Sequence, residues 1–368
     1  MMISSNKIML GKFSRRWWRW GWPILTFIVV FAGLQFDARW YRQPIARVQT
    51  VQTTRVSHPV DNFENRDRIV TQKVHAVLLN TQHRGRQLTL HNTYSASGAE
   101  DAPLAKGQQV FLARSGRHYT ITNIKRDAIL GALISATLVL LGLIVGRHLW
   151  LTLASITANA LLFILALHVE IASHQVLAFL LFSAVAVGFT VITTLFVVGA
   201  KPLAAVVAGA TMLATALGVS LGYGIFVWTN YQDLHLETVK YVTQAPQLLF
   251  FVQIIIGSLG AVLDESSDIA VAIFQLNSGA KARFQAGMAI GRNVMGPLIA
   301  VLFMIFIAET FAEGVLWLRN GNAISQTVVW VMGLGFAQSL ISAFGIVLTV
   351  PLTSGLAALA ARWQGRQR

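Results

Sequence analysis

Long apolar runs and one long polar stretch divide the chain. The first apolar run covers residues 21–36, and the next begins only at residue 128. Seven runs then follow closely, at residues 128–146, 149–167, 176–199, 202–228, 247–263, 296–318 and 325–350. A helix needs about 20 apolar residues to cross a bilayer, so the pattern predicts a helical bundle with about eight transmembrane helices.

The first apolar run has the flanks of a membrane anchor. Lys12 and Arg19 precede it, and several Trp residues stand at its start. At about 1.5 Å per residue it covers about 24 Å, so we expect flanking Trp and Arg residues to complete the crossing. A cleaved signal peptide is the alternative, but a cut after Ala38 would place Phe36 where a small residue is needed. We therefore expect an uncleaved signal anchor over residues 21–38.

Basic residues in the short segments beside the spans predict the orientation. One face collects Lys7, Lys12, Arg15, Arg16, Arg19, Arg147, Lys201, Lys281, Arg283, Arg292, Arg362, Arg366 and Arg368. The opposite short loops hold Lys240 and Arg319. Short cytoplasmic loops are rich in Lys and Arg, so both termini are predicted to be cytoplasmic. The predicted order is a cytoplasmic segment, the anchor, an extracytoplasmic domain, a seven-helix domain and a second cytoplasmic segment, at residues 1–20, 21–38, 39–126, 127–352 and 353–368.

Alternating apolar and polar residues predict short strands in the extracytoplasmic domain. The alternation occurs at residues 70–79, 87–94, 110–114 and 118–125. Four or five strands on so short a segment predict a small β-rich barrel of the OB or SH3 type. The domain holds about 14 basic and 5 acidic residues. This charge favours either capture of an anionic cell-wall polymer, lipid headgroup or solute, or a solvated basic face beside anionic lipid.

Composition supports the membrane assignment and narrows the chemistry. Apolar residues make up 55% of the chain and charged residues 12%, with a mean hydropathy of +0.59. The apolar surface is therefore too large for one soluble core, and the lipid bilayer is the expected surrounding. The net charge of +14 favours anionic partners. Nucleic acid is not expected among them, because most of this charge is predicted to lie outside the cell.

The residue types present also limit catalysis and metal binding. The chain has no cysteine, which excludes disulfides, thiolate catalysis, Cys-based zinc sites and iron–sulfur clusters. It has no Walker A, HExxH or dinucleotide motif, so we predict neither an enzyme nor a cofactor. Two predicted loops carry residues that could bind a divalent metal, namely His168, Glu170, His174, Asp233, His235 and Glu237. Their spacing matches no recognised motif, so we predict no metal site.

The sixth predicted span carries polar residues that membrane helices rarely tolerate. Gln253 lies inside it, and Asp264 and Asp268 follow near its end. A continuing helix would point both carboxylates at one place, where they need a cation, a shared proton or a basic partner. Arg292, beside Asn293 at the start of the next span, is the nearest basic partner in the sequence. The alternative is a helix that has already left the membrane, with the two carboxylates at its wet cytoplasmic end.

Other features of these two spans have more than one interpretation. Gly257 and Gly260 could break the sixth helix or allow a neighbour to pack closely. Glu309 lies about 13 residues into its span, and an intramembrane glutamate is a functional candidate by default. Gln338 and Thr193 are instead expected to hydrogen-bond between helices.

Several short motifs occur between these residues and near the C-terminus. They are Gly260-Ala261-Val262-Leu263-Asp264, Asp268-Ile269-Ala270, Gly287-Met288-Ala289-Ile290-Gly291-Arg292-Asn293-Val294-Met295-Gly296 and Val350-Pro351-Leu352-Thr353. With them the chain resembles the YibE/F family of bacterial multi-pass membrane proteins, and its plan is similar to the longer, YibE-like members. It departs from the family pattern at Asn293, where an aspartate is expected, and at Pro297, where a Thr-rich continuation is expected.

The resemblance implies a transporter or permease of the bacterial plasma membrane, often accompanied by a shorter, YibF-like protein. The glycines in the motifs are expected to mark helix breaks or close packing. These glycines are Gly257, Gly260, Gly287, Gly291 and Gly296.

Two hypotheses for function follow. The first is a permease-like subunit whose ion or substrate pathway is formed by Gln253, Asp264, Asp268, Arg292, Asn293 and Glu309, with the basic domain gathering or gating an anionic species. The second is a scaffold or assembly subunit in which the same polar residues bind a YibF-like partner and the external domain contacts the cell wall. A membrane enzyme acting on lipid-linked substrates is a third hypothesis, but no nucleophile and base pair stands out in the sequence.

Overall fold

The computed structural model describes residues 20–60, 66–96, 98, 101–116, 118–173, 178–232, 234–239 and 246–366. The predictions made for the basic residues of segment 1–19, for His174, Asp233, Lys240 and Arg368 fall outside this part of the chain. Two compact units are present, residues 1–149 and residues 150–368. Each is described by itself.

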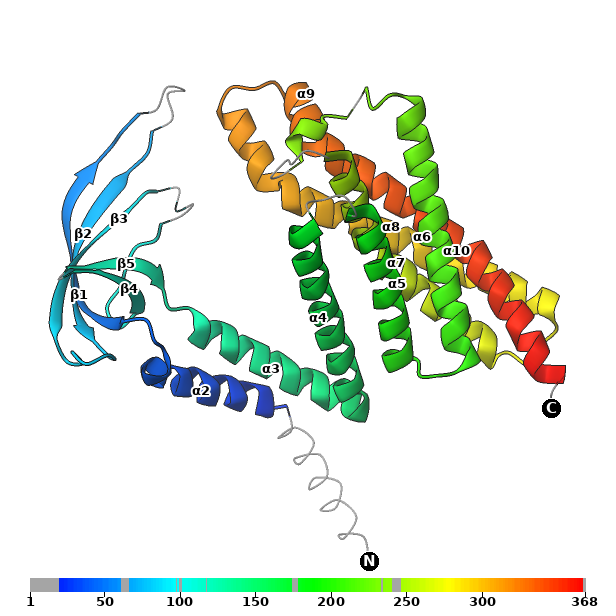
Figure 1. Ribbon diagram of the computed structural model, residues 1–368, viewed down its shortest axis with the longest axis horizontal. Helices are drawn as coiled ribbons and strands as arrows, with labels where there is room; N and C mark the ends of the chain where they lie inside the picture. Colours follow the sequence, from blue (N-terminus) through cyan, green and yellow to red (C-terminus); the bar gives the residue numbers. More distant parts are fainter. Residues whose placement is uncertain are drawn as a thin grey trace, which may run out of the picture. The chain divides into compact units, whose positions relative to one another are not determined.

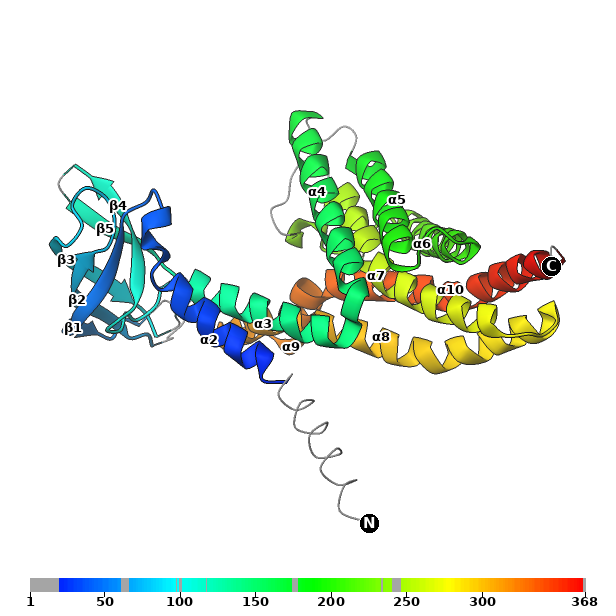
Figure 2. The same cartoon turned by 90° about the horizontal axis from the view of Figure 1, so that it is seen from below.

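The first unit contains two helices that pack side by side (Figure 1, Figure 2). The first, α2 (Trp22–Leu34), is 13 residues long and starts at Trp22-Pro23, a position that suits proline because its missing N–H has no helical partner there. The second, α3 (Asp127–Val145), is long and apolar enough to cross a membrane. Gly131 of α3 leaves room for Leu34 of α2, since a Cβ at Gly131 would lie 2.6 Å from Leu34 Cδ1.

A five-stranded antiparallel sheet lies between α2 and α3 in the chain. The strands are β1 (Ile45–Ser57), β2 (Ile69–Leu78), β3 (Gln87–Tyr94), β4 (Gln109–Ser115) and β5 (His118–Ile124), in the order β3-β2-β1-β4-β5. The edge strands β3 and β5 also contact each other. A central β1 and touching edges are the arrangement of a five-stranded, partly open barrel of the OB type. The predicted β-rich domain is therefore confirmed.

The barrel core is built from the inward-facing residues of four strands. Ala46, Val48, Val74, Leu90 and Leu112 are among its buried members. The long strand β1 changes register twice, between Val48 and Thr50 and between Thr53 and Arg55. Such bulges bend a strand, which lets β1 pair with β2 along its length and with β4 at its beginning.

A buried lysine joins the barrel to the two helices of this unit. Lys125 follows β5, and its Nζ lies 2.7 Å from Asp37 Oδ1, 2.9 Å from Asp127 Oδ1 and 2.9 Å from the carbonyl oxygen of Leu34. These three acceptors match the three N–H donors of the ammonium group. The Tyr41 hydroxyl donates to Asp127, and this hydrogen bond, with burial and the nearby carboxylates, raises the pKa of Tyr41 to about 12. The cluster fixes the end of α2, the end of β5 and the start of α3 together.

We predict that Lys125→Met destabilises the first unit strongly. The side chains of Lys125 and Asp37 are 2% and 3% exposed, so the substitution leaves Asp37 buried without its cation. Loss of one partner of a buried ion pair costs about 3–5 kcal/mol. Thermal unfolding of the purified protein should show a large fall in Tm for Lys125→Met and little change for Lys106→Met, which replaces an exposed lysine. Equal Tm values for the two variants would contradict this structural role.

The second unit is a bundle of long helices. They are α4 (Leu149–Ser173), α5 (Ala178–Val197), α6 (Pro202–Trp228), α7 (Pro246–Gln275), α8 (Ala280–Arg319) and a last helix made of α9 (Ile324–Thr327), the π-helical segment η4 (Val328–Met332) and α10 (Gly333–Arg366). With α3 they give seven helices among the described residues that are long and apolar enough to cross a membrane, and α2 is a shorter eighth. The predicted membrane bundle is thus confirmed.

Two helices differ from their predicted extents. The sixth predicted span, residues 247–263, is the first part of α7, which continues without interruption to Gln275. The helix therefore does not end at Asp264, and neither Gly257 nor Gly260 breaks it. The seventh, residues 296–318, is the second part of α8, which begins at Ala280 and contains Pro297. The early turns of α8 contain polar residues, so the hydropathy pattern did not identify them as part of this helix.

Helix α10 packs against α6, α7 and α8 (Figure 2). Gly218 of α6 lies against Gly345 of α10, because a Cβ at Gly218 would lie 2.9 Å from the backbone nitrogen of Gly345. A Cβ at Gly345 would in turn lie 3.3 Å from Val262 of α7. Gly218 and Gly345 thus bring three helices together at one level, and small residues commonly have this role in helix packing in membranes.

We predict that Gly218→Ala destabilises the bundle. The added methyl group meets backbone atoms, which cannot rotate away, and overpacking of this kind costs about 1–3 kcal/mol. Gly224→Ala on the same helix is the matched control, because no atom lies within 4 Å of a Cβ built there. In detergent, Tm should fall for Gly218→Ala and stay constant or rise slightly for Gly224→Ala. A fall of equal size in both would indicate a general effect of alanine on α6.

Candidate functional site

A polar cavity of about 700 Å³ lies among α4, α5, α7, α8 and the η4–α10 segment. Its polar wall consists of two amides, two carboxylates and a hydroxyl, from Gln253, Gln338, Glu309, Glu313 and Thr310. Its apolar wall includes Phe163, Phe182, Phe306 and Trp330. A cavity of this size, mostly apolar with a few convergent polar groups, is typical of a ligand site.

One face of α7 supplies polar groups to the cavity and beyond it. Gln253, Gly257, Gly260, Asp264 and Asp268 are spaced four, three, four and four residues apart, which places them on one side of a helix. All five are exposed, meaning that the protein itself does not cover them. The opposite side of α7 is buried against α6 and α10. The helix therefore separates a packed face from a polar face.

The glycines of the predicted site serve mainly in packing. Gly257 lies beside Gln338, whose Nε2 would be 3.0 Å from a Cβ at that position, so the glycine lets the Gln338 amide reach the cavity wall. A Cβ at Gly287 would clash with Ser354 of α10 and Ile273 of α7, and one at Gly291 would clash with Val350. Gly260 and Gly296, in contrast, have open space around them.

A π-helical segment borders the cavity. It spans Val328–Met332 and contributes Trp330 and Val331 to the wall. Single π-helical turns often occur at functional sites, because they widen a helix locally and redirect its side chains. The ring of His235 stacks on Trp330 with 3.9 Å between centroids, and its Nδ1 lies 2.9 Å from Glu237 Oε1. This hydrogen bond lowers the pKa of Glu237.

The structure brings only some of the predicted site residues together. Gln253, Gly257 and Glu309 all line the polar cavity. Asp264 and Asp268 lie further along the same face of α7, outside the cavity wall. Within the described part of the chain, no ion pair joins either carboxylate to Arg292.

Arg292 and Asn293 lie on α8, where both are exposed. Only residues 276–279 connect α7 to α8, and Gly287 packs against Ile273, so the two helices run in opposite directions at this end of the bundle. Arg292 is five residues beyond Gly287, and Asp268 is five residues before Ile273. Each is therefore about 7.5 Å from the contact along its own helix, at about 1.5 Å per residue, so the two lie at a similar height.

A third acidic residue of α7 was not among the predicted site residues. Glu265 is 0% exposed, and neither of its carboxylate oxygens has a hydrogen-bond partner among the described residues. It lies three residues after Val262 and four before Ile269, both buried, on the packed face of the helix. The helical spacing of Glu265 from Val262 and Ile269 could have indicated that its side chain is buried. The pair Asp264 and Asp268, on another face of the helix, was the more obvious candidate.

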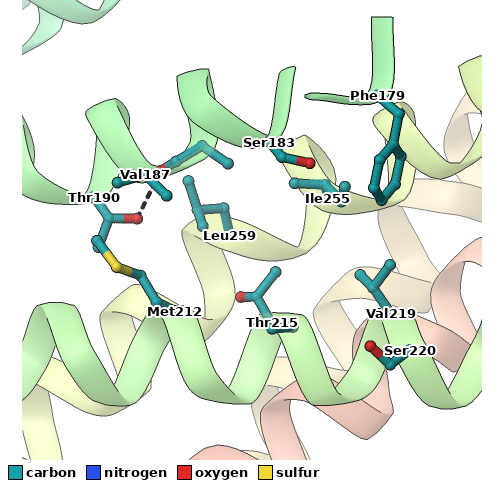
Figure 3. A pocket seen from close by; sticks show the side chains of 12 residues that line it. Phe179, Ser183, Val187, Thr190, Met212, Thr215, Val219, Ser220, Ile255 and Leu259 are labelled. Carbon is teal, nitrogen blue, oxygen red and sulfur yellow. Dashed lines mark hydrogen bonds between the residues drawn. The ribbon is translucent and has the colours of Figure 1, made fainter. Parts of the chain in front are cut away.

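A second cavity, of about 220 Å³, lies among α5, α6 and α7 (Figure 3). Ser183, Thr190, Thr215 and Ser220 provide its polar atoms, and the rest of the wall is apolar. The Thr190 hydroxyl donates to the carbonyl oxygen of Ala186, on its own helix. None of the residues that line this cavity is charged, so it suits an apolar group better than an ion.

The four described residues among the metal ligands considered in the sequence, His168, Glu170, His235 and Glu237, are not assembled into a metal site. Among the described residues, no three His, Asp or Glu side chains gather closely enough to hold a metal ion. His235 and Glu237 instead pair with each other. The ring of His168 lies within hydrogen-bonding distance of the carbonyl oxygen of Ile164 on its own helix.

Comparison with known proteins matches both units to one family. Residues 39–126 match the model described as YibE/F family N-terminal domain, and residues 133–363 match the one described as YibE/F-like protein. The second match contains all the motifs on which the resemblance rests. No curated protein and no solved structure matches the chain.

We predict that water reaches the polar cavity. The chain has no cysteine, so a single introduced cysteine is a unique label site. Glu309→Cys and Gln338→Cys should react several-fold faster with a membrane-impermeant maleimide than Ala214→Cys, which lies at a fully buried position. Labelling of intact cells and of inverted vesicles will also show on which side the cavity opens. Equally slow reaction at all three positions would mean that the cavity is closed to water.

Proposed function

Because this chain belongs to the YibE/F family, and the polar cavity of its bundle is acidic, with Glu309 and Glu313 in its wall, we propose that it is a permease-like subunit of the bacterial plasma membrane that passes a small cation or protons. This cavity is called the acidic cavity below. The observation that carries the proposal is the convergence of Glu309, Glu313, Gln253 and Gln338 on one cavity between apolar helices. Intramembrane carboxylates are expensive and typically mark ion or substrate pathways.

The polar face of α7 supports a pathway beyond the cavity. Gln253 and Gly257 lie at the cavity, and Asp264 and Asp268 continue the same face toward the other end of the helix. A solvated cation that leaves the cavity would meet carboxylates along this face and the basic Arg292 at the height of Asp268. We propose transport without a catalytic step and without a cofactor, and both termini in the cytoplasm in keeping with the distribution of Lys and Arg.

The same face of α7 also supports the alternative of an assembly subunit. Asp264 and Asp268 are exposed in this chain, although they lie on a membrane-spanning helix. Charged groups within a bilayer usually face the interior of a bundle or water. A second membrane protein, such as a YibF-like partner, could cover them. The external barrel would then contact an anionic cell-wall polymer.

Cation binding at the cavity is the test of the permease. Purified protein is heated with the chloride salts of sodium, potassium, magnesium, choline and guanidinium, with gluconate salts as the anion control. A cation at about 100 times its Kd should stabilise the fold by about 2.7 kcal/mol. We expect a rise in Tm for at least one cation with wild type, its loss in Glu309→Gln, and its retention in Asp67→Asn, which changes a carboxylate of the first unit.

A flux measurement completes this test. The cation that binds should cross the membrane of proteoliposomes made with wild type, and Glu309→Gln should slow it at least tenfold. If no cation shifts Tm and none crosses, while Asp264→Asn and Asp268→Asn lose a co-purifying membrane partner, the assembly subunit is the correct function.

A further inference from the structure

The buried carboxyl group of Glu265 lies at the centre of the packed part of the second unit. Its side chain is 0% exposed, and both oxygens lack a hydrogen-bond partner within the described residues. Glu265 is 19 residues from the start of α7 and 10 from its end, about 28 Å and 15 Å along the helix axis. It therefore occupies the interior of a membrane-spanning helix, not an end.

Apolar side chains enclose Glu265 along the helix axis. On one side Val262 packs with Ala214 of α6 and Ile346 of α10. On the other side Ile269 packs with Val207 of α6 and Val350 of α10. Glu265 lies between these two clusters on the same face of α7, so α6 and α10 cover it with residues that cannot solvate a charge.

The hydroxyl groups at the same height are already used. Ser266 donates to the carbonyl oxygen of Leu263, 2.9 Å away, so the 2.7 Å contact between Ser266 and Thr211 is a hydrogen bond donated by Thr211. Thr349 of α10, one turn beyond the Gly345 that faces Val262, donates to the carbonyl oxygen of Gly345. Thr215 of α6 and Thr353 of α10 have buried hydroxyl groups without a partner among the described residues, but each lies a full helical turn beyond Thr211 or Thr349. Neither helix thus offers a free hydroxyl donor at the height of Glu265 itself.

Charged groups near Glu265 do not pair with it among the described residues. No Lys, Arg, His, Asp or Glu occurs in α5, in α6 or in residues 333–361 of α10, and Tyr223 is the one titratable residue there. On α7 itself Asp264 is adjacent and Asp268 is one turn away, both acidic. From α8 come Arg292, which is exposed and forms no ion pair among the described residues, and the more distant Lys281, Arg283, Glu309 and Glu313.

We propose that Glu265 is a proton-binding site: in the packed bundle its carboxyl group is neutral and holds one proton. An isolated carboxylate without donors or a cation is too costly in such surroundings, and neutralisation removes most of that cost. Release of the proton requires water or a cation to enter between α6, α7 and α10. Protonation is therefore coupled to the packing of these three helices. Glu265 does not line the acidic cavity, and the proposal does not rest on the proposed permease function.

Infrared spectroscopy tests the proposal directly. An ordinary glutamate ionises at about pH 4.3, so purified wild type at about pH 8 should show the carbonyl band of a protonated carboxylic acid only if a group such as Glu265 retains its proton. The band should vanish in Glu265→Gln and remain in Asp264→Asn, the matched control at the adjacent, exposed position. If Glu265→Gln fails to fold, wild type with carbon-13-labelled glutamate should show the band shifted, and an unshifted or absent band overturns the proposal.

The dependence of stability on pH gives a second, independent readout. The folded protein retains the Glu265 proton while the unfolded chain releases it above about pH 4.3, so this residue makes stability fall as pH rises. In Glu265→Gln that contribution disappears, and the variant should match or exceed the Tm of wild type at about pH 8. A lower Tm for Glu265→Gln, together with a rise in the Tm of wild type on addition of sodium or potassium, would show instead a carboxylate that binds a metal cation.

Discussion

The close approach of α6, α7 and α10 is the constraint on which the second unit depends. Gly218 and Gly345 allow backbone to meet backbone, and Val262 fills the space beside them. In a bilayer, apolar helices gain little from leaving lipid, so packing between small residues must hold them together. This contact fixes the rotation of α7. Once Val262 faces α6 and α10, Glu265 and Ile269 must face them too, and Gln253, Asp264 and Asp268 must lie on the opposite side.

The acidic residues of α7 consequently lie in two different environments although they are neighbours in sequence. Asp264 and Asp268 remain uncovered by the protein, where water, a cation, a headgroup or a partner can reach them. Glu265 is sealed among methyl groups and cannot be reached without moving a helix. A shift in how α10 packs on α7 would therefore change the environment of Glu265 and, through Gly257 and Gln338, the wall of the acidic cavity.

Hydropathy alone was sufficient for the number and order of the membrane helices, since each apolar run became one helix. It failed where a helix continues through polar residues, namely in the early turns of α8 and beyond Asp264 in α7. Strand β1 was not identified because its two bulges interrupt the alternation that marks a strand. Gln253, Gly257 and Glu309 could be chosen as candidates from sequence, but their meeting in one cavity depends on helix rotation, which a single sequence does not specify.

The two units carry opposite charges at the places where they could meet a solute. The barrel segment is rich in Lys and Arg, whereas the cavity of the bundle presents Glu309 and Glu313. The buried Lys125 does not add to the basic surface, because Asp37, Asp127 and the Leu34 carbonyl occupy its three donors. One solute cannot be favoured by both charges. An anion held by exposed basic residues of the barrel would be repelled at the cavity, and a cation suited to the cavity gains nothing from the barrel. Under the proposed permease function the two units would recognise different partners, and the charge of the barrel would suit anionic polymer or lipid better than delivery of a cation.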